Sequence, residues 1–190
     1  MNIGLFFGSF NPIHIGHLIV ANIMANADGI DQVWFVVSPQ NPFKKSANLL
    51  HEFDRYDMVE KAIADNPKLK VSDIEFSMPK PSYTIDTLAR LTEKYPNHTF
   101  KLIIGEDNLS QFSKWKNADK ILEYYGLLVY PRPKAEPHNY GNHHNVQFIE
   151  APLLDISATF IRNQLLGGKS IKYMVPEVVE GYIQLKKLYQ

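Results

Sequence analysis

Apolar residues along the chain fall into two patterns, short continuous runs and stripes at helical spacing. Continuous apolar runs, typical of strands buried on both faces, cover residues 3–7, 32–37, 100–104, 127–130 and 146–149. Residues 69–76 alternate between apolar and polar, as in a half-exposed strand. Stripes between these runs predict helices at about 18–25, 52–64, 84–95 and 158–166, and another after Pro176, with Thr84 as the candidate N-cap of the third. This alternation predicts an α/β fold with a doubly wound, mostly parallel sheet flanked by helices, formed as a single domain over residues 1–190.

The turn between the first predicted strand and the first predicted helix contains the largest group of candidate ligand-binding residues. Gly8 lets the backbone approach a ligand, and the start of the helix directs N–H groups and a positive dipole end toward it, which suits a phosphate. His14 and His17 lie three residues apart, so a helical turn brings both imidazoles to one side. A structural histidine pair and a metal site are the alternatives, but no Cys, His or carboxylate follows at a spacing that would complete a metal site. The turn therefore predicts a phosphate site with two side-chain donors.

Residues 155–162 form a second candidate phosphate-binding segment, far from the first. Ser157 is a favourable N-cap for the helix that follows, and a helix start offers backbone N–H groups to a ligand. Arg162 lies about one turn into that helix, where its guanidinium can bind phosphate oxygens through two parallel hydrogen bonds. Taken alone, the segment is better explained by an ordinary capped helix with a surface arginine.

The composition narrows the choice of partners. Lys plus Arg equals Asp plus Glu, at 20 each, so no net field attracts nucleic acid or a membrane surface, and we expect neither as a partner. The chain has no cysteine, which removes thiolate nucleophiles, disulfides and Cys-based zinc sites. It starts directly with a strand, and no apolar run reaches membrane-spanning length, so we expect a cytoplasmic protein. The sequence leaves a homo-oligomer open.

The two turns together resemble the signatures of the nucleotidylyltransferase superfamily. The stretch G-S-F-N-P-I-H-I-G-H (8–17) resembles its H-x-G-H signature, and I-S-A-T-F-I-R (156–162) is similar to I-S-[ST]-x-x-[IV]-R. The resemblance implies a Rossmann-like fold and transfer of a nucleotidyl group from a nucleoside triphosphate to a phosphate-bearing acceptor. It implies that His14, His17 and Arg162 are catalytic, and that Mg²⁺ is bound with ATP, with no metal site made by the protein alone. The residues implied to bind ATP are Gly8, Ser9, Phe10, Gly16, Ile156, Ser157 and Ala158.

Three further segments suggest the acceptor. V-S-P-Q-N-P-F-K-K (37–45), P-S-Y-T-I-D-T-L (81–88) and G-E-D-N-L-S-Q-F-x-x-W (105–115) resemble bacterial nicotinate mononucleotide adenylyltransferases. The resemblance implies ATP and nicotinate mononucleotide as substrates, with the indole of Trp115 stacked on the pyridine ring. The residues implied to bind the acceptor are Lys44, Tyr83, Thr84, Asp107 and Trp115. One departure is Phe43, where many members carry a histidine before the basic residue.

Two alternatives stay open at this stage. Nicotinamide mononucleotide or phosphopantetheine could be the acceptor in the same reaction, although the phosphopantetheine family usually has Thr where His14 stands. The chain could instead be a non-catalytic sensor of adenine nucleotides, which would not need to keep His14, His17 and Arg162. Pyrophosphate release with ATP and each acceptor in turn would separate these hypotheses.

Overall fold

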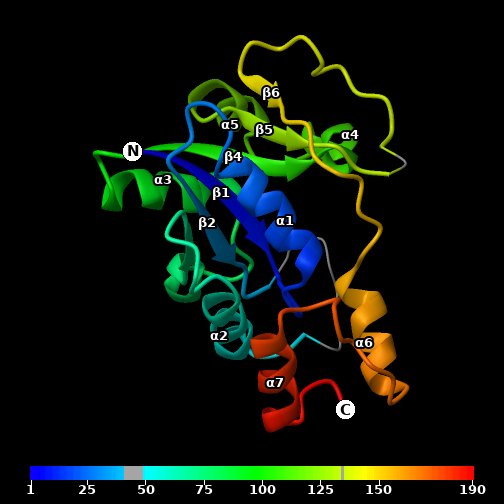
Figure 1. Ribbon diagram of the computed structural model, residues 1–190. Coiled ribbons are helices and arrows are strands. Elements are labelled where there is room, and N and C mark those ends of the chain that lie inside the picture. Colours follow the sequence, from blue (N-terminus) through cyan, green and yellow to red (C-terminus); the bar gives the residue numbers. More distant parts are fainter. Residues whose placement is uncertain (41–48, 134) are drawn as a thin grey trace.

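A computed structural model describes residues 1–40, 49–133 and 135–190 of the chain. Its centre is a six-stranded sheet with the strand order β3-β2-β1-β4-β5-β6 (Figure 1). The strands are β1 (Asn2–Gly8), β2 (Gln32–Val37), β3 (Leu69–Ser72), β4 (Thr99–Gly105), β5 (Leu127–Tyr130) and β6 (Val146–Phe148). Every neighbouring pair runs parallel, which confirms the predicted sheet.

Helices pack on both faces of the sheet, as a doubly wound fold requires. One face is covered by side chains of α1 (Ile15–Met24), α2 (Glu52–Ala62), α6 (Ala158–Leu166) and α7 (Glu177–Lys186). The other face is covered by α3 (Thr84–Lys94), α4 (Leu109–Phe112) and α5 (Ala118–Tyr124). Two short 3₁₀ helices, η1 (Ile74–Ser77) and η2 (Glu106–Asn108), each follow a strand.

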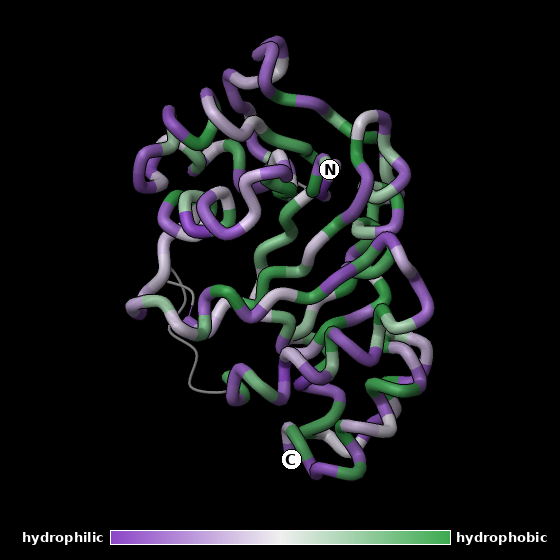
Figure 2. Tube along the Cα trace, turned by 90° about the vertical axis from the view of Figure 1, so that its left-hand side faces the viewer, coloured by the Kyte–Doolittle hydropathy of each residue, from purple (hydrophilic) through white to green (hydrophobic). Residues whose placement is uncertain are grey.

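The core is divided by the sheet because successive strand residues point to opposite faces. In β2, Phe35 packs on the side of α1 and α2, whereas Trp34 and Val36 pack on the side of α3. These side chains are almost completely buried, which explains why the strands have continuous apolar sequences. Figure 2 shows the strands in the middle of the molecule as mostly hydrophobic.

The structure differs from the sequence-based expectation at three helix or strand boundaries. The strand predicted over 69–76 ends at Ser72, whose hydroxyl accepts a hydrogen bond from the Ile74 N–H and turns the chain into η1. The first helix begins at Ile15, earlier than predicted, because His14 caps it. Thr84 is the first residue of α3, and Tyr83, not Thr84, is its N-cap.

The strand order places a crevice at one edge of the sheet. The chain passes from β1 to β2 and β3 on one side and then to β4, β5 and β6 on the other, so the connections after β1 and β4 diverge. In open α/β sheets, ligands bind at this point, outside the carboxyl ends of the strands. In the described part of the chain, no helix has the length and apolar character needed to cross a membrane.

Candidate active site

The turn after β1 is held in shape by the two histidines predicted from the sequence. The Nδ1 atom of His14 accepts a hydrogen bond from the His17 N–H at 3.4 Å, and the Nδ1 atom of His17 accepts one from the His14 N–H at 3.3 Å. This reciprocal capping box stacks the two rings, with centroids 3.6 Å apart. A neutral imidazole whose Nδ1 accepts a hydrogen bond carries its proton on Nε2. Both rings are thus set to act as donors through Nε2.

His14 is neutral at physiological pH. Only 5% of its surface is exposed, and burial, followed by the nearby positive charge of Arg132, lowers its pKa to about 4. A neutral ring with its proton on Nε2 donates a hydrogen bond without first losing or gaining a proton. The site therefore offers His14 as a fixed polar donor and not as a cation.

The turn before α6 contacts the turn after β1, as the two predicted phosphate-binding segments require. Ser157 caps α6, because its hydroxyl accepts a hydrogen bond from the Phe160 N–H at 3.2 Å. Arg162 reaches across and donates from Nη1 to the carbonyl oxygen of Asn11 at 2.7 Å, over a separation of 151 residues. Two helix N-termini, α1 and α6, therefore meet at one place.

Gly16 allows the two segments to approach this closely. A Cβ atom at this position would lie 2.5 Å from Cγ2 of Ile156 and 3.1 Å from the ring of His14. Gly8 is similarly confined, because a Cβ atom there would lie 2.8 Å from the ring of Phe10. These two glycines are required by packing, since any side chain would displace the residues that form the site.

A cavity of about 980 Å³ brings most of the predicted residues together. Its lining includes Gly8, Ser9, Phe10, His14, Gly16, His17, Tyr83, Thr84, Trp115, Ile156, Ser157, Ala158 and Arg162. Asp107 is not among the lining residues, and its carboxylate lies 3.7 Å from the Nε atom of Arg132. Lys44 and Phe43 lie outside the residues that the structure describes.

Part of the cavity lining is aromatic and basic. Tyr83 and Thr84 lie at the N-terminus of α3, and Trp115 lies beside Phe112 with ring centroids 5.5 Å apart. The Nζ atom of Lys116 sits 4.8 Å from the centroid of the Tyr83 ring. The same ammonium is paired with the Asp86 carboxylate at 2.8 Å, so a planar group is matched here mainly by the indole and by the backbone N–H donors at the start of α3.

Several polar residues of the site were not singled out from the sequence. Arg132 follows β5 in the segment Pro131-Arg132-Pro133, and its position after a strand was the available signal. Glu75 is 2% exposed and accepts hydrogen bonds from Ser82 at 2.8 Å and Thr87 at 2.7 Å. Burial raises the pKa of Glu75, although these hydroxyl donors oppose the rise. No periodicity in the sequence distinguishes this buried carboxylate from an exposed one.

The family of the chain follows from comparison with known proteins. A family model described as cytidylyltransferase-like matches residues 5–164. The chain therefore belongs to the cytidylyltransferase-like family, a class of nucleotidyltransferases with this α/β fold.

Relatives place the chain more narrowly within that class. A probable nicotinate-nucleotide adenylyltransferase of Cytophaga hutchinsonii is 61% identical over 189 residues, covering 100% of this chain and 98% of that protein. One of Flavobacterium johnsoniae is 50% identical over 192 residues and is covered over its full length. The chain is a member of the nicotinate-nucleotide adenylyltransferase family.

Solved structures agree on the fold. The nicotinic acid mononucleotide adenylyltransferase of Plasmodium falciparum, in complex with NaAD, matches with a TM-score of 0.84 at 24% sequence identity. The match covers 99% of this chain and 97% of that one. At this level of identity, the likeness supports the architecture and carries no residue roles.

Proposed function

We propose that this chain transfers the adenylyl group of ATP to nicotinate mononucleotide and forms deamido-NAD and pyrophosphate, a step in NAD biosynthesis. The observation that carries the proposal is one cavity whose lining includes His14, His17 and Arg162 together with Tyr83 and Trp115. Such a cavity can hold a nucleoside triphosphate and an aromatic nucleotide side by side. The names of the relatives give a nicotinate nucleotide as the acceptor and an adenylyl group as the group transferred.

The reaction needs positioning more than covalent chemistry. A phosphate oxygen of the acceptor attacks the α-phosphorus of ATP in line, and the bond from that phosphorus to the oxygen bridging it to the β-phosphate breaks. Negative charge develops on the α-phosphate oxygens and on the leaving pyrophosphate. His14 and His17 donate hydrogen bonds to the α-phosphate region from their Nε2 atoms, which are fixed before the reaction starts.

The outer phosphates bind at the start of α6. The guanidinium of Arg162 and the N–H groups after Ser157 hold the β- and γ-phosphates. Ala158 stands where the related signature has Ser or Thr, so its contribution is its backbone N–H. Gly8, Ser9, Phe10, Gly16 and Ile156 shape the wall against which the nucleotide lies.

The acceptor binds at the aromatic end of the cavity. The pyridine ring stacks on Trp115, and its carboxylate faces Tyr83, Thr84 and the N-terminus of α3. Lys44 is proposed to contact the acceptor phosphate, from its place in the sequence alone. Asp107 is proposed to act near the acceptor while paired with Arg132.

Mg²⁺ is proposed to enter with ATP, where it neutralises charge on the triphosphate. The described residues contain no group of three or more His, Cys, Asp or Glu side chains placed to hold a metal. An ion that takes its ligands from phosphate oxygens and water suits such a site. We further propose that residues 1–190 act as one domain in the cytoplasm. A monomer and a homo-oligomer are both compatible with this proposal.

Pyrophosphate release tests the proposal. The purified chain is incubated with ATP, Mg²⁺ and, separately, nicotinate mononucleotide, nicotinamide mononucleotide or phosphopantetheine. We expect the highest kcat/KM with nicotinate mononucleotide, and a loss on the order of 10²–10³ in kcat for the folded His17→Ala variant. Highest turnover with another acceptor would reassign the substrate, and ATP binding without any release would favour the sensor.

A further inference from the structure

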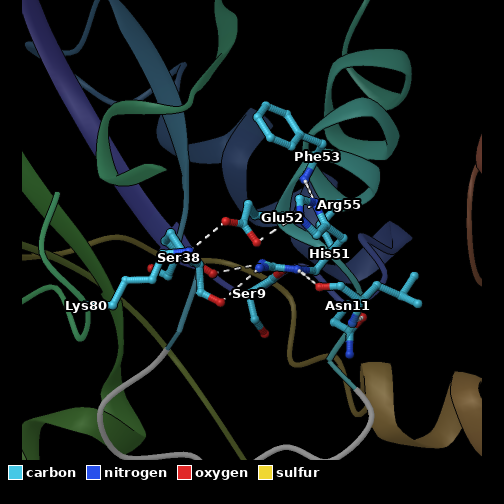
Figure 3. A network of polar contacts seen from close by, with 10 residues as sticks. Ser9, Asn11, Ser38, His51, Glu52, Phe53, Arg55 and Lys80 are labelled. Carbon is cyan, nitrogen blue, oxygen red and sulfur yellow. Dashed lines mark hydrogen bonds and ion pairs between the residues drawn. The ribbon is translucent and has the colours of Figure 1, made fainter. Parts of the chain in front are cut away.

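Arg55 is a buried cation in α2 whose partners are backbone carbonyl oxygens. The residue is 0% exposed, and four hydrogen bonds leave its guanidinium. Nε donates to Leu50 at 2.9 Å, Nη2 donates to Pro39 at 3.1 Å, and Nη1 donates to both Ser9 at 2.6 Å and Ser38 at 2.8 Å. Figure 3 shows the guanidinium between these loops.

The four acceptors belong to segments that form different parts of the cavity. Ser9 lies in the phosphate-binding turn after β1, whereas Ser38 and Pro39 follow β2. The Ser38 side chain hydrogen-bonds to Glu75, which also holds Ser82 next to Tyr83. One atom, Nη1, therefore links the ATP side of the site to the acceptor side. Leu50 extends the link, because its N–H donates to the side chain of Asn11, whose backbone oxygen binds Arg162.

The charge of Arg55 is not used in an ion pair. Among the residues that the structure describes, no carboxylate oxygen lies within 4.0 Å of its guanidinium. The nearby Glu52 is bonded instead to Lys80 at 2.7 Å, and that hydrogen bond lowers the pKa of Glu52. Burial lowers the pKa of Arg55, yet a guanidinium stays protonated in proteins.

These hydrogen bonds allow Arg55 to hold several loops in fixed positions, which a surface ion pair does not do. We call this arrangement a clamp. A guanidinium presents five N–H donors in a rigid plane, so it can fix several carbonyl groups relative to one another. A lysine in the same place presents its three donors from a single atom and cannot span the same four acceptors. Any buried carbonyl that loses its donor destabilises the local arrangement.

We propose that Arg55 is a positioning residue for adenylyl transfer, which sets the distance between the turn that binds ATP and the segment directly after β2 that supports the acceptor side of the cavity. The inference rests on the proposed function. In-line attack depends on the separation of the acceptor phosphate from the α-phosphorus, and a misplacement of about 1 Å can cost about 10²-fold in rate. Arg55 touches neither substrate in this scheme and acts only through the loops.

The test compares Arg55→Lys with Met58→Ala, a buried apolar change in the same helix that leaves the four hydrogen bonds in place. Wild-type pyrophosphate release is measured first; its absence would overturn the proposed function and, with it, the role of Arg55 in transfer, whereas an active wild type with an equally active Arg55→Lys would overturn the role of Arg55 alone. We then expect Arg55→Lys to lose about 10²-fold in kcat per folded molecule while each KM changes far less. Met58→Ala is expected to unfold at a lower temperature but to keep the wild-type kcat below that temperature.

Binding separates the clamp from a general loss of structure. By isothermal titration calorimetry, Arg55→Lys should bind ATP nearly as well as the wild type, but bind deamido-NAD, which spans both sides of the site, much more weakly. Unchanged kcat, or equal losses of affinity for both ligands, would overturn the proposal. If Arg55→Lys does not fold, Arg55→Gln is measured in the same way. Failure of both to fold, with Met58→Ala folded, would assign Arg55 to the stability of the fold and also overturn it.

Discussion

The protonation state of His14 can be tested through the pH dependence of stability. Burial and the charge of Arg132 lower the pKa of this imidazole from 6.5 to about 4 in the folded protein. Between these values, the unfolded chain binds a proton that the folded protein does not, so the free energy of unfolding falls as the pH falls through this window. From about pH 7.5 to about pH 5, the shift corresponds to a loss of about 2 kcal/mol.

The measurement is urea unfolding of the wild type and of His14→Asn at both pH values. Asparagine also caps helix N-termini but has no titrating ring, so the variant retains the cap and loses the proton-binding group. Glu75 and the other ionisable groups titrate in both proteins and cancel in the comparison. We expect the wild type to lose about 2 kcal/mol more than His14→Asn on acidification. Parallel pH dependence in the two proteins would refute the assignment of His14 as a buried neutral ring.

Three substitutions test residues that line the cavity or hold its lining in place. Arg162→Lys retains the positive charge but loses the planar guanidinium that can donate two parallel hydrogen bonds. We expect kcat/KM for ATP, measured by pyrophosphate release, to fall about 10²-fold. Gly16→Ala places a methyl group against Ile156 and His14, and should cost about 1–3 kcal/mol in urea unfolding and weaken ATP binding; adding Ile156→Ala should restore part of the stability. Tyr189→Phe removes the hydroxyl that donates to the side chain of Asn11 at 2.8 Å, and should cost about 1 kcal/mol in the same assay. An unchanged value in any of these assays would contradict the contact concerned.

Most of the sheet could be predicted from the sequence because its strands are buried on both faces. The apolar runs at 32–37 and 127–130 coincide with β2 and β5, and those at 3–7 and 100–104 fall within β1 and β4. The prediction for 69–76 was wrong in its second half, because the alternation of apolar residues continues through η1. A local hydrogen bond from the Ile74 N–H to the Ser72 hydroxyl ends the strand. The pattern of apolar residues does not reveal such a bond.

The parts of the candidate site that lie in short motifs could be predicted from the sequence. The residues that reach the site only through tertiary packing could not. The turns containing His14, His17 and Arg162 each have a local pattern, and the structure places them around one cavity. Arg55 and Glu75 have no such pattern, because a buried charge in a helix looks like a surface charge in the sequence. Their positions follow only from tertiary packing, which brings backbone carbonyls to Arg55 and hydroxyls to Glu75.

The hydrogen bond between Arg162 and Asn11 has a consequence for the order of folding and ATP binding. If α6 binds the outer phosphates of ATP as proposed, an intermediate in which α6 has not yet docked would carry the histidine pair but lack that phosphate-binding part of the site. ATP would then bind only to molecules in which α6 has already docked against the turn after β1. By mass action, ATP should therefore protect the entire molecule against unfolding, and resistance to protease in its presence would report completed folding.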